Sequence, residues 1–371
     1  MLLICSCFSY ADKPVPDLPD FYLQLKAQQQ FSDSWDKSRF PDIRQWKAQA
    51  RAIVRESLLW PDNPVPFNAE LQQTEQRHGY RAERWQIQLT AESRVPVMLL
   101  IPDALAKPAP AILLLHDHGA FFDIGKEKMI RPLQGSSQLT IAQQWADKYF
   151  SGRFIGDELA AQGYLVVAAD TFGWGERGPL QFTQQQALAA NFLLLGRSLA
   201  GMAAYEDLRL TEFIRQLPQA DSQRIGVLGF SMGAFKAWQL AALTDDIKAT
   251  VAVAWMNTYQ QLIVPGNNIL TGQSAFYMLH PGLAARLDIP DVAAIAAPGA
   301  MMFINGAKDK LMPVAGAEQA YQKLRLIWQQ YDAAEQLSTT LWPEYGHEFS
   351  LEQQQQAIEW LERQLKDASS K

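Results

Sequence analysis

Cysteine is almost absent from this chain. Among its 371 residues there are two, Cys5 and Cys7, and both stand within the first seven positions. The body of the protein therefore contains no disulfide framework, and no cysteine is available there as a nucleophile. Any covalent catalysis in this body needs another nucleophilic side chain.

Long runs of like charge and long apolar segments are missing as well. The formal net charge is -6, and no five consecutive residues carry charge of one sign. This gives no electrostatic footprint for nucleic acid or for an anionic membrane. Beyond the first residues, no segment approaches the roughly 20 apolar residues that span a bilayer. With 48% hydrophobic and 19% charged residues, the sequence is typical of a globular protein with a sizeable core, and it fixes no oligomeric state.

The first eleven residues are apolar and end in small side chains. Ser9 and Ala11 have the size found at a signal-peptidase cleavage site, although no basic residue precedes the apolar stretch. We expect residues 1–11 to be a truncated signal peptide, and the protein to be exported to the periplasm or outside the cell. A lipid-modified Cys7 and an ordinary cytoplasmic N-terminus are the alternatives.

The segment 12–79 differs in pattern from the rest of the chain. A Pro-rich leader is followed, over 21–60, by helical spacing of large apolar residues, which predicts two helices packed outside a sheet. From residue 80 on, alternating apolar and polar residues at 80–90 and 95–101 predict two antiparallel strands. The expected division is an N-terminal helical extension over 12–79 and one α/β domain over 80–371.

Short apolar runs then alternate with amphipathic segments. Runs of this length are typical of buried parallel strands, and they occur at 111–115, 164–169, 224–228, 249–254, 300–304 and 338–342. Amphipathic segments that predict helices lie at 205–217, 234–243 and 315–329. The alternation predicts an α/β fold with a doubly wound, mostly parallel sheet.

Two connections, 121–152 and 255–297, are too long to be simple loops. We expect both to be insertions over the carboxyl ends of the strands, where open α/β sheets bind ligands.

The segment Gly229-Phe-Ser-Met-Gly233 matches the G-x-S-x-G pattern of a nucleophile elbow. Three fixed positions in five are a weak signal alone, but an apolar run precedes this segment and a helical pattern follows it. Flanking glycines let the chain turn sharply, so that the serine oxygen projects above the sheet near the positive end of the helix. We expect Ser231 to be a nucleophile; a glycine-rich turn without a catalytic role is the alternative.

A serine hydroxyl needs a base within hydrogen-bond reach. Two histidines follow Ser231 in the chain, His280 and His347. His347 stands between the last predicted strand and the last predicted helix, where this chain order places the base. His280 lies inside the second long connection and is the weaker candidate.

The base in turn needs a carboxylate that fixes its tautomer. Asp309 follows the apolar run 300–304 directly, which is the place that the chain order serine, acid, histidine provides. Asp288 and Asp291, inside the second long connection, are weaker alternatives.

Acyl transfer also needs two fixed N–H donors for the oxyanion of its tetrahedral intermediate. One donor is expected from Met232, the residue after the nucleophile. The other is expected in the turn that follows the run 111–115, from the N–H of Ala120 or Phe121. The same turn contains the pair His116 and His118, which could be interpreted as metal ligands, but no third ligand is evident in the sequence.

Three side chains are candidates for the lining of a substrate site: His118, Trp174 and Trp255. The chain has eleven tryptophans, and such rings line clefts or fill cores. Trp174 lies in a Gly-rich segment that follows the run 164–169. A turn locked by the Trp174 ring and an Arg177 ion pair is the structural alternative there.

Together these motifs resemble the dienelactone hydrolase-like and acetyl xylan esterase-like branch of the α/β hydrolases, over roughly residues 80 to 365. The resemblance rests on His116-Asp-His-Gly119, Asp170-Thr-Phe-Gly-Trp-Gly-Glu-Arg177, Gly229-Phe-Ser-Met-Gly-Ala-Phe-Lys-Ala-Trp238, Asn305-Gly-Ala-Lys-Asp309 and His347-Glu-Phe349. Dienelactone hydrolases use a cysteine nucleophile, so Ser231 departs from them. The acetyl xylan esterase-like relatives are serine enzymes, often exported, that act on acyl groups of plant-type sugars.

The sequence thus predicts a serine carboxylic-ester hydrolase that acts through an acyl-enzyme and needs no cofactor. The expected substrate is a small-molecule or oligosaccharide ester, for example an acetylated sugar. A prolyl-oligopeptidase-like peptidase is an alternative, but the first 80 residues are too few for the propeller such enzymes carry. A catalytically silent binding protein of the same fold is the other alternative, and the complete triad argues against it.

Overall fold

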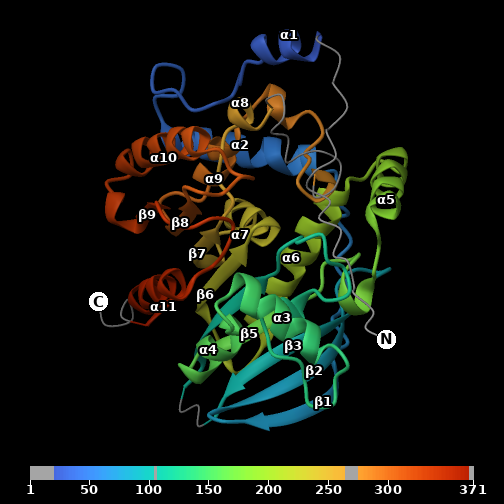
Figure 1. Cartoon of the computed structure of the whole chain (residues 1–371). Helices are drawn as coiled ribbons and strands as arrows, with labels where there is room; N and C mark the ends of the chain where they lie inside the picture. Colours follow the sequence, from blue (N-terminus) through green and yellow to red (C-terminus); the bar gives the residue numbers. More distant parts are fainter. Residues whose placement is uncertain (1–20, 104–106, 264–274, 367–371) are drawn as a thin grey trace, which may run out of the picture.

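The computed structural model describes residues 21–103, 107–263 and 275–366 (Figure 1). Its centre is a nine-stranded sheet in the order β1-β2-β3-β5-β4-β6-β7-β8-β9. The strands are β1 (Glu70–Arg77), β2 (Tyr80–Gln88), β3 (Arg94–Pro102), β4 (Ala109–Leu115), β5 (Leu165–Ala169), β6 (Ala220–Phe230), β7 (Ile247–Val253), β8 (Ala300–Gly306) and β9 (Leu337–Trp342). Strands β4 to β9 are parallel, and β1 to β3 form an antiparallel edge that joins β5 through β3. The mostly parallel α/β sheet is confirmed.

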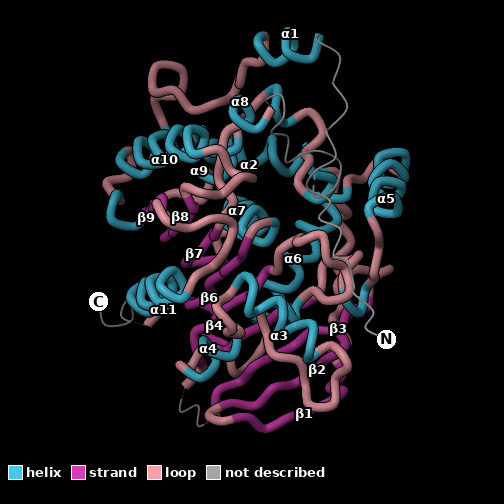
Figure 2. Tube along the Cα trace, viewed as in Figure 1, coloured by secondary structure: helices cyan, strands magenta, loops and turns pink. Residues whose placement is uncertain are grey.

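Helices cover both faces of this sheet (Figure 2). They are α1 (Phe21–Ala27), α2 (Ile43–Leu58), α3 (Leu139–Tyr149), α4 (Ile155–Ala161), α5 (Phe182–Leu194), α6 (Leu199–Gln216), α7 (Met232–Leu243), α8 (Tyr259–Leu262), α9 (Ile289–Ala294), α10 (Val314–Gln329) and α11 (Leu351–Leu365). One core contains side chains of α2, α6, α7, α9 and α10, and the other contains side chains of α3, α4 and α11. The sheet is therefore doubly wound, as the alternation of elements predicted.

Strand β4 shows why these apolar runs are strands. Leu113 and Leu115 face the first core, whereas Ile112 and Leu114 face the second, because successive side chains of a strand point to opposite faces. Both faces of β4 are buried, so a continuous apolar run is required in place of an alternating one.

The N-terminal segment contains the two expected helices, and it also contains a strand that the sequence did not predict. Strand β1 pairs with β2 in antiparallel register, so the sheet begins at Glu70, ten residues before the expected boundary at residue 80. Most residues of β1 are exposed, and Leu71 is the one apolar residue in this strand. Strand β1 therefore lacks the apolar alternation that identifies a strand. The expected signal peptide at 1–11 lies outside the described residues.

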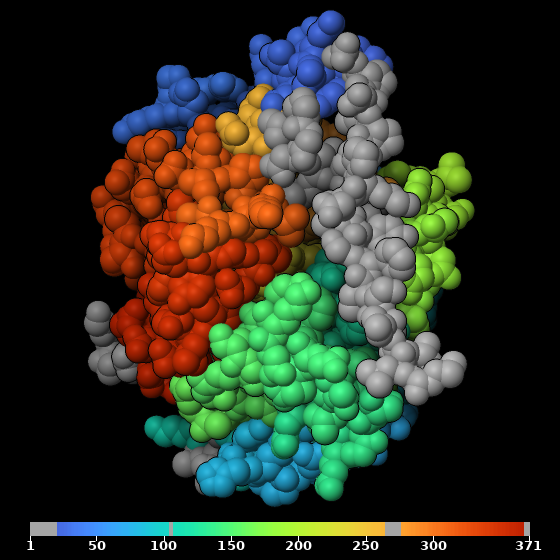
Figure 3. Space-filling view, viewed as in Figure 1, coloured from blue at the N-terminus to red at the C-terminus, as the bar shows by residue number. Residues whose placement is uncertain are grey.

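The two long connections leave the sheet at the carboxyl ends of β4 and β7. The first contains α3, and the described parts of the second contain α8 and α9. The first also contacts the segment before α11, where the Phe349 N–H donates to the Tyr149 carbonyl at 2.8 Å. In the space-filling view these two parts, green and red, lie side by side (Figure 3).

Helix α5 was not predicted and projects from the body of the molecule (Figure 1). Among the described residues, no single helix has the length and hydrophobicity of a membrane span. Helices α5 and α6 meet that criterion only when they are counted together, although they are bent by 88° against each other.

Candidate active site

Ser231 stands in the sharp turn between β6 and α7. Its backbone has φ 55° and ψ -120°, a conformation that L-residues rarely adopt and that marks strain at functional turns. The turn lies against the chain after β4: a Cβ on Gly233 would come within 1.8 Å of the Leu115 carbonyl oxygen. Glycine at 233 is thus required by a close approach of two backbones, and this approach fixes the place of the serine.

The structure brings Ser231, His347 and Asp309 together in one hydrogen-bonded chain. His347 Nε2 lies 2.8 Å from Ser231 Oγ, and His347 Nδ1 lies 2.7 Å from Asp309 Oδ2. A carboxylate accepts only, so Nδ1 carries the proton and Nε2 can accept from the serine hydroxyl. The Asp309 side chain is fully buried, and that of His347 is 20% exposed, so the base remains open to a ligand.

Three parallel strands on one side of the sheet, β6, β8 and β9, provide these three groups, with β7 between β6 and β8. Ser231 follows β6, Asp309 follows β8, and His347 follows β9. Carboxyl ends of parallel strands meet at one edge of a sheet, which is why residues 116 positions apart in the chain can form a hydrogen bond here.

The weaker candidates have structural roles. His280 is buried and shares a hydrogen bond with Gln239, and burial lowers the pKa of His280 to about 4. Asp288 caps α9 through the N–H of Ile289, and its own N–H donates to Asp291. These groups lie apart from the Ser231 hydrogen-bonded chain.

The turn after β4 also reaches this edge, and it distinguishes the two expected oxyanion donors. The Ala120 N–H donates to Nδ1 of His118 at 3.1 Å, so this N–H is already engaged within the turn. Among the described residues, the Phe121 N–H donates to no protein acceptor. Met232 is the first residue of α7, where an N–H has no acceptor inside the helix. Phe121 and Met232 therefore remain the two candidates for the oxyanion donors.

The pair His116 and His118 does not form an open metal site. The Nε2 atom of His116 accepts from the Thr171 N–H at 3.0 Å, and its Nδ1 lies 2.9 Å from the Asp117 carbonyl oxygen. Burial, more than the nearby lysines, holds the pKa of His116 well below its usual value, so the ring is neutral. Nδ1 of His118 is likewise engaged, by the Ala120 N–H.

One carboxylate cluster in the described part of the chain has the spacing of a metal site. Oxygens of Glu127, Asp170 and Glu176 lie within 4.8 Å of one another. Lys126 Nζ forms ion pairs with all three, at 2.7 to 2.9 Å. The buried ammonium of Lys126 therefore already contacts all three carboxyl groups and offsets part of the negative charge that would attract a metal cation.

Two tryptophans expected to line the site are buried instead. Trp174 has no exposed surface, and its Nε1 donates to the His118 carbonyl at 3.1 Å, beneath the turn. Trp255 packs against Phe235 and Trp238 in the core. Arg177 pairs with Glu206, which matches the structural alternative for this loop. His118 is buried as well and acts on the turn through its ring nitrogen.

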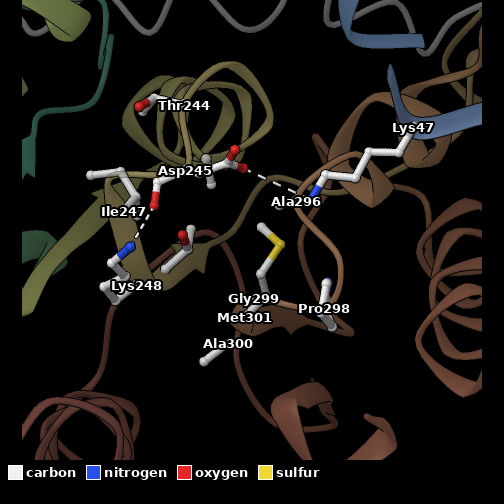
Figure 4. Close-up of a pocket in the computed structure, with 12 residues that line it drawn as sticks. Lys47, Thr244, Asp245, Ile247, Lys248, Ala296, Pro298, Gly299, Ala300 and Met301 are labelled. Atoms are coloured by element: carbon white, nitrogen blue, oxygen red, sulfur yellow. Dashed lines mark hydrogen bonds and ion pairs between the residues drawn. The ribbon is translucent and has the colours of Figure 1, made fainter. Parts of the chain in front are cut away.

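A separate hollow of about 210 Å³ lies at the opposite edge of the sheet, at the amino ends of β7 and β8 (Figure 4). Lys47 reaches toward it from α2, but its Nζ donates to the Ala297 carbonyl at 2.7 Å. Lys248 Nζ donates to the Asp245 carbonyl at 2.7 Å. The sheet separates this hollow from Ser231, and its charged groups are already engaged.

This fold and this hydrogen-bonded chain define an α/β hydrolase. The model of the Abhydrolase family matches residues 20–363, and the chain belongs to this family. The expectation drawn from the motifs is thereby confirmed.

Known proteins of similar sequence and structure agree with this assignment. "Putative hydrolase YtaP" of Bacillus subtilis is 27% identical over 270 residues, which cover 73% of this chain and 84% of that protein. The crystal structure of a "putative acetyl xylan esterase" from Bacteroides fragilis has a TM-score of 0.72 at 20% identity, over 89% of this chain and 83% of that one. The glucuronoyl esterase from Solibacter usitatus has a TM-score of 0.63 at 13% identity, over 89% and 94%. At these identities the two structures show the shared fold.

Proposed function

We propose that the protein is a serine carboxylic-ester hydrolase in which Ser231 is the nucleophile. The observation that carries this proposal is the unbroken hydrogen-bonded chain from Ser231 Oγ through His347 to Asp309. Family membership supports hydrolysis, and the strained, half-buried serine at the head of α7 supports its role as the attacking group.

The first half-reaction transfers the acyl group to the serine. Ser231 Oγ attacks the ester carbonyl carbon while His347 Nε2 takes the hydroxyl proton. The oxyanion accepts hydrogen bonds from the N–H groups of Met232 and Phe121. The intermediate collapses, the C–O bond to the alcohol breaks, and His347 returns the proton to the leaving alkoxide.

The second half-reaction releases the acid. His347 takes a proton from water, the hydroxide attacks the acyl-enzyme carbonyl, and Ser231 Oγ leaves with the proton that His347 held. Asp309 stays ionised and keeps the proton of His347 on Nδ1 throughout.

We propose that the alcohol is a sugar. A strip of aromatic rings leads from the turn to the base: Phe121 stacks on Trp145, then Tyr149, Phe230 and His347 follow, with centroids 4.5 to 6.2 Å apart. Phe121 and Tyr149 are half-buried, so part of each ring remains open. Flat apolar rings beside an ester-cleaving serine suit the apolar face of a pyranose, and one similar structure is named a "putative acetyl xylan esterase".

The test compares wild type with Ser231→Ala on p-nitrophenyl acetate and on acetylated xylooligosaccharides, in which the alcohol is a sugar. We expect the variant to fold normally and to lose about 10⁴-fold or more in kcat, because the nucleophile is gone. Unchanged turnover in Ser231→Ala would rule out Ser231. A wild type that cleaves the phenyl ester but not the acetylated xylooligosaccharides would refute the sugar alcohol and leave the serine esterase standing.

We also propose that the protein is exported. The support is the apolar segment 1–11 with its small residues at the end. Mass spectrometry of the N-terminus of protein from the periplasmic or culture fraction tests this. A mature chain that starts after Ala11 is expected, and an intact Met1 in the cytoplasm would contradict the proposal.

A further inference from the structure

The turn that presents the Phe121 N–H has an unusual backbone. Gly119 and Ala120 both have positive φ, 62° and 52°, in two successive residues. Such a conformation is unfavourable for Ala120, so surrounding structure must hold it. The holding groups come from outside β4 and its turn.

Lys128 is the central holding group. Its side chain has no exposed surface, and its Nζ donates to the carbonyls of Asp117 and His118, each at 3.0 Å. Nζ also pairs with Asp117 Oδ2 at 3.2 Å. All three donors of one buried ammonium are thus used on two consecutive residues of the turn. Because a carbonyl fixes the plane of its peptide, Lys128 fixes the path of the chain into Gly119.

A second route leads from Lys128 to Phe121 through Trp145. Lys128 Nζ lies 4.6 Å from the centre of the Trp145 ring, a cation–π contact. Trp145 Nε1 donates to Asp117 Oδ1 at 3.2 Å, which fixes the ring in its plane. Phe121 then stacks on this ring at 5.6 Å and 17°. The Phe121 side chain is therefore packed on the Trp145 ring, and Lys128 and Asp117 hold this ring in place. Within the described residues, the backbone N–H of Phe121 is left without a protein acceptor.

We propose that Lys128 is a positioning residue that holds the Phe121 N–H at the oxyanion of the tetrahedral intermediate. This inference rests on the proposed ester hydrolysis. Lys128 touches no reacting atom; it acts through the two carbonyls and through Trp145. Its loss displaces one oxyanion donor and leaves the Ser231–His347–Asp309 chain in place.

The experiment uses Lys128→Met, which keeps the length of the side chain and removes its charge and donors. The readouts are kcat and KM for p-nitrophenyl acetate, the rate at which a fluorophosphonate modifies Ser231, and the melting temperature. We expect kcat and the rate of phosphonylation to fall together by about 10- to 100-fold, because each needs the oxyanion donors, with KM changed less than about twofold.

Arg77→Met is the matched control. Arg77 is a buried cation as well: its Nη2 donates to the carbonyls of Arg131 and Pro132, and its Nη1 pairs with Asp157. In the described structure it forms no hydrogen bond with the turn at 116–121. We expect a similar loss of melting temperature with kcat unchanged.

The double variant Asp117→Asn/Lys128→Met covers the case in which Lys128→Met fails to fold. It removes the carboxylate left without its cation, so stability should recover while kcat stays low. Wild-type kcat in either Lys128 variant, or a rise in KM alone, would overturn the positioning role. If wild type itself neither cleaves the ester nor reacts with the fluorophosphonate, the proposed function fails, which is a distinct result.

Discussion

The two halves of the active site are built in different ways. Ser231 directly follows β6, and Asp309 and His347 lie in the short segments after β8 and β9, so the alignment of these strands brings the three residues to the same end of the sheet. The turn at 116–121 also follows a strand, but its shape depends on side chains from distant segments. The side chains of Lys128, Trp145 and Trp174 all donate hydrogen bonds to Asp117 or His118 in this turn.

This difference predicts different responses to substitution. A change in the triad half removes a chemical group and leaves the sheet intact, so activity falls with little loss of stability. A change in the turn half disturbs buried polar contacts, whose loss costs stability as well as the placement of an N–H donor.

Asp309→Asn should give the largest effect and the cleanest separation. The Asn oxygen can still accept from the Leu311 N–H, as Oδ1 of Asp309 does at 2.8 Å, so the fold is kept. The amide no longer stabilises the imidazolium or the correct tautomer, and kcat should fall about 10³- to 10⁴-fold. Ester kinetics and a denaturant titration check this. A large loss of stability would show that the two halves are not built differently.

Gly119→Ala should give an intermediate loss of kcat together with a loss of stability. Its Cβ would lie 2.4 Å from both Asp117 Oδ2 and the Trp145 ring, at φ 62°, so one of these groups must move. We expect a loss of about 1–3 kcal/mol in stability and about tenfold or more in kcat. Gly163→Ala is the control, since Gly163 has φ 91° with nothing within 4 Å of the added Cβ. Equal kcat in the two variants would contradict the role of the turn.

Asp288→Asn should have the smallest effect on activity, because Asp288 belongs to neither half. Burial raises the pKa of Asp288 to about 6, against an ordinary value near 3.8. The folded protein therefore binds this proton more tightly than the unfolded chain, and stability falls as the pH rises from about 4 through 6. The Asn variant keeps the acceptor for the Ile289 N–H but cannot ionise.

Relative to wild type, Asp288→Asn should thus gain up to about 3 kcal/mol between pH 4 and pH 7. Urea titrations at the two pH values measure this difference, and kcat at pH 7 should be unchanged. A difference in stability that does not depend on pH would show that Asp288 is ionised normally in the folded protein.

Much of the triad half could be predicted from the sequence. The apolar runs mark the buried strands, the glycines around Ser231 mark the sharp turn, and Asp309 and His347 follow their strands directly. These signals are local, and parallel strands align their carboxyl ends whatever lies between them. Strand β1 escaped prediction because an exposed edge strand needs no apolar face.

The turn half could not be predicted in the same way. The sequence alone determined the α/β fold, the triad and the segment that carries the second oxyanion donor. Only the tertiary structure decided that Phe121, and not Ala120, keeps its N–H available, because His118 folds back to accept from Ala120. It also decided that Trp174 and Lys128 are buried beneath the turn. Such assignments depend on which donors from distant segments reach the same carbonyls, and no local pattern encodes that meeting.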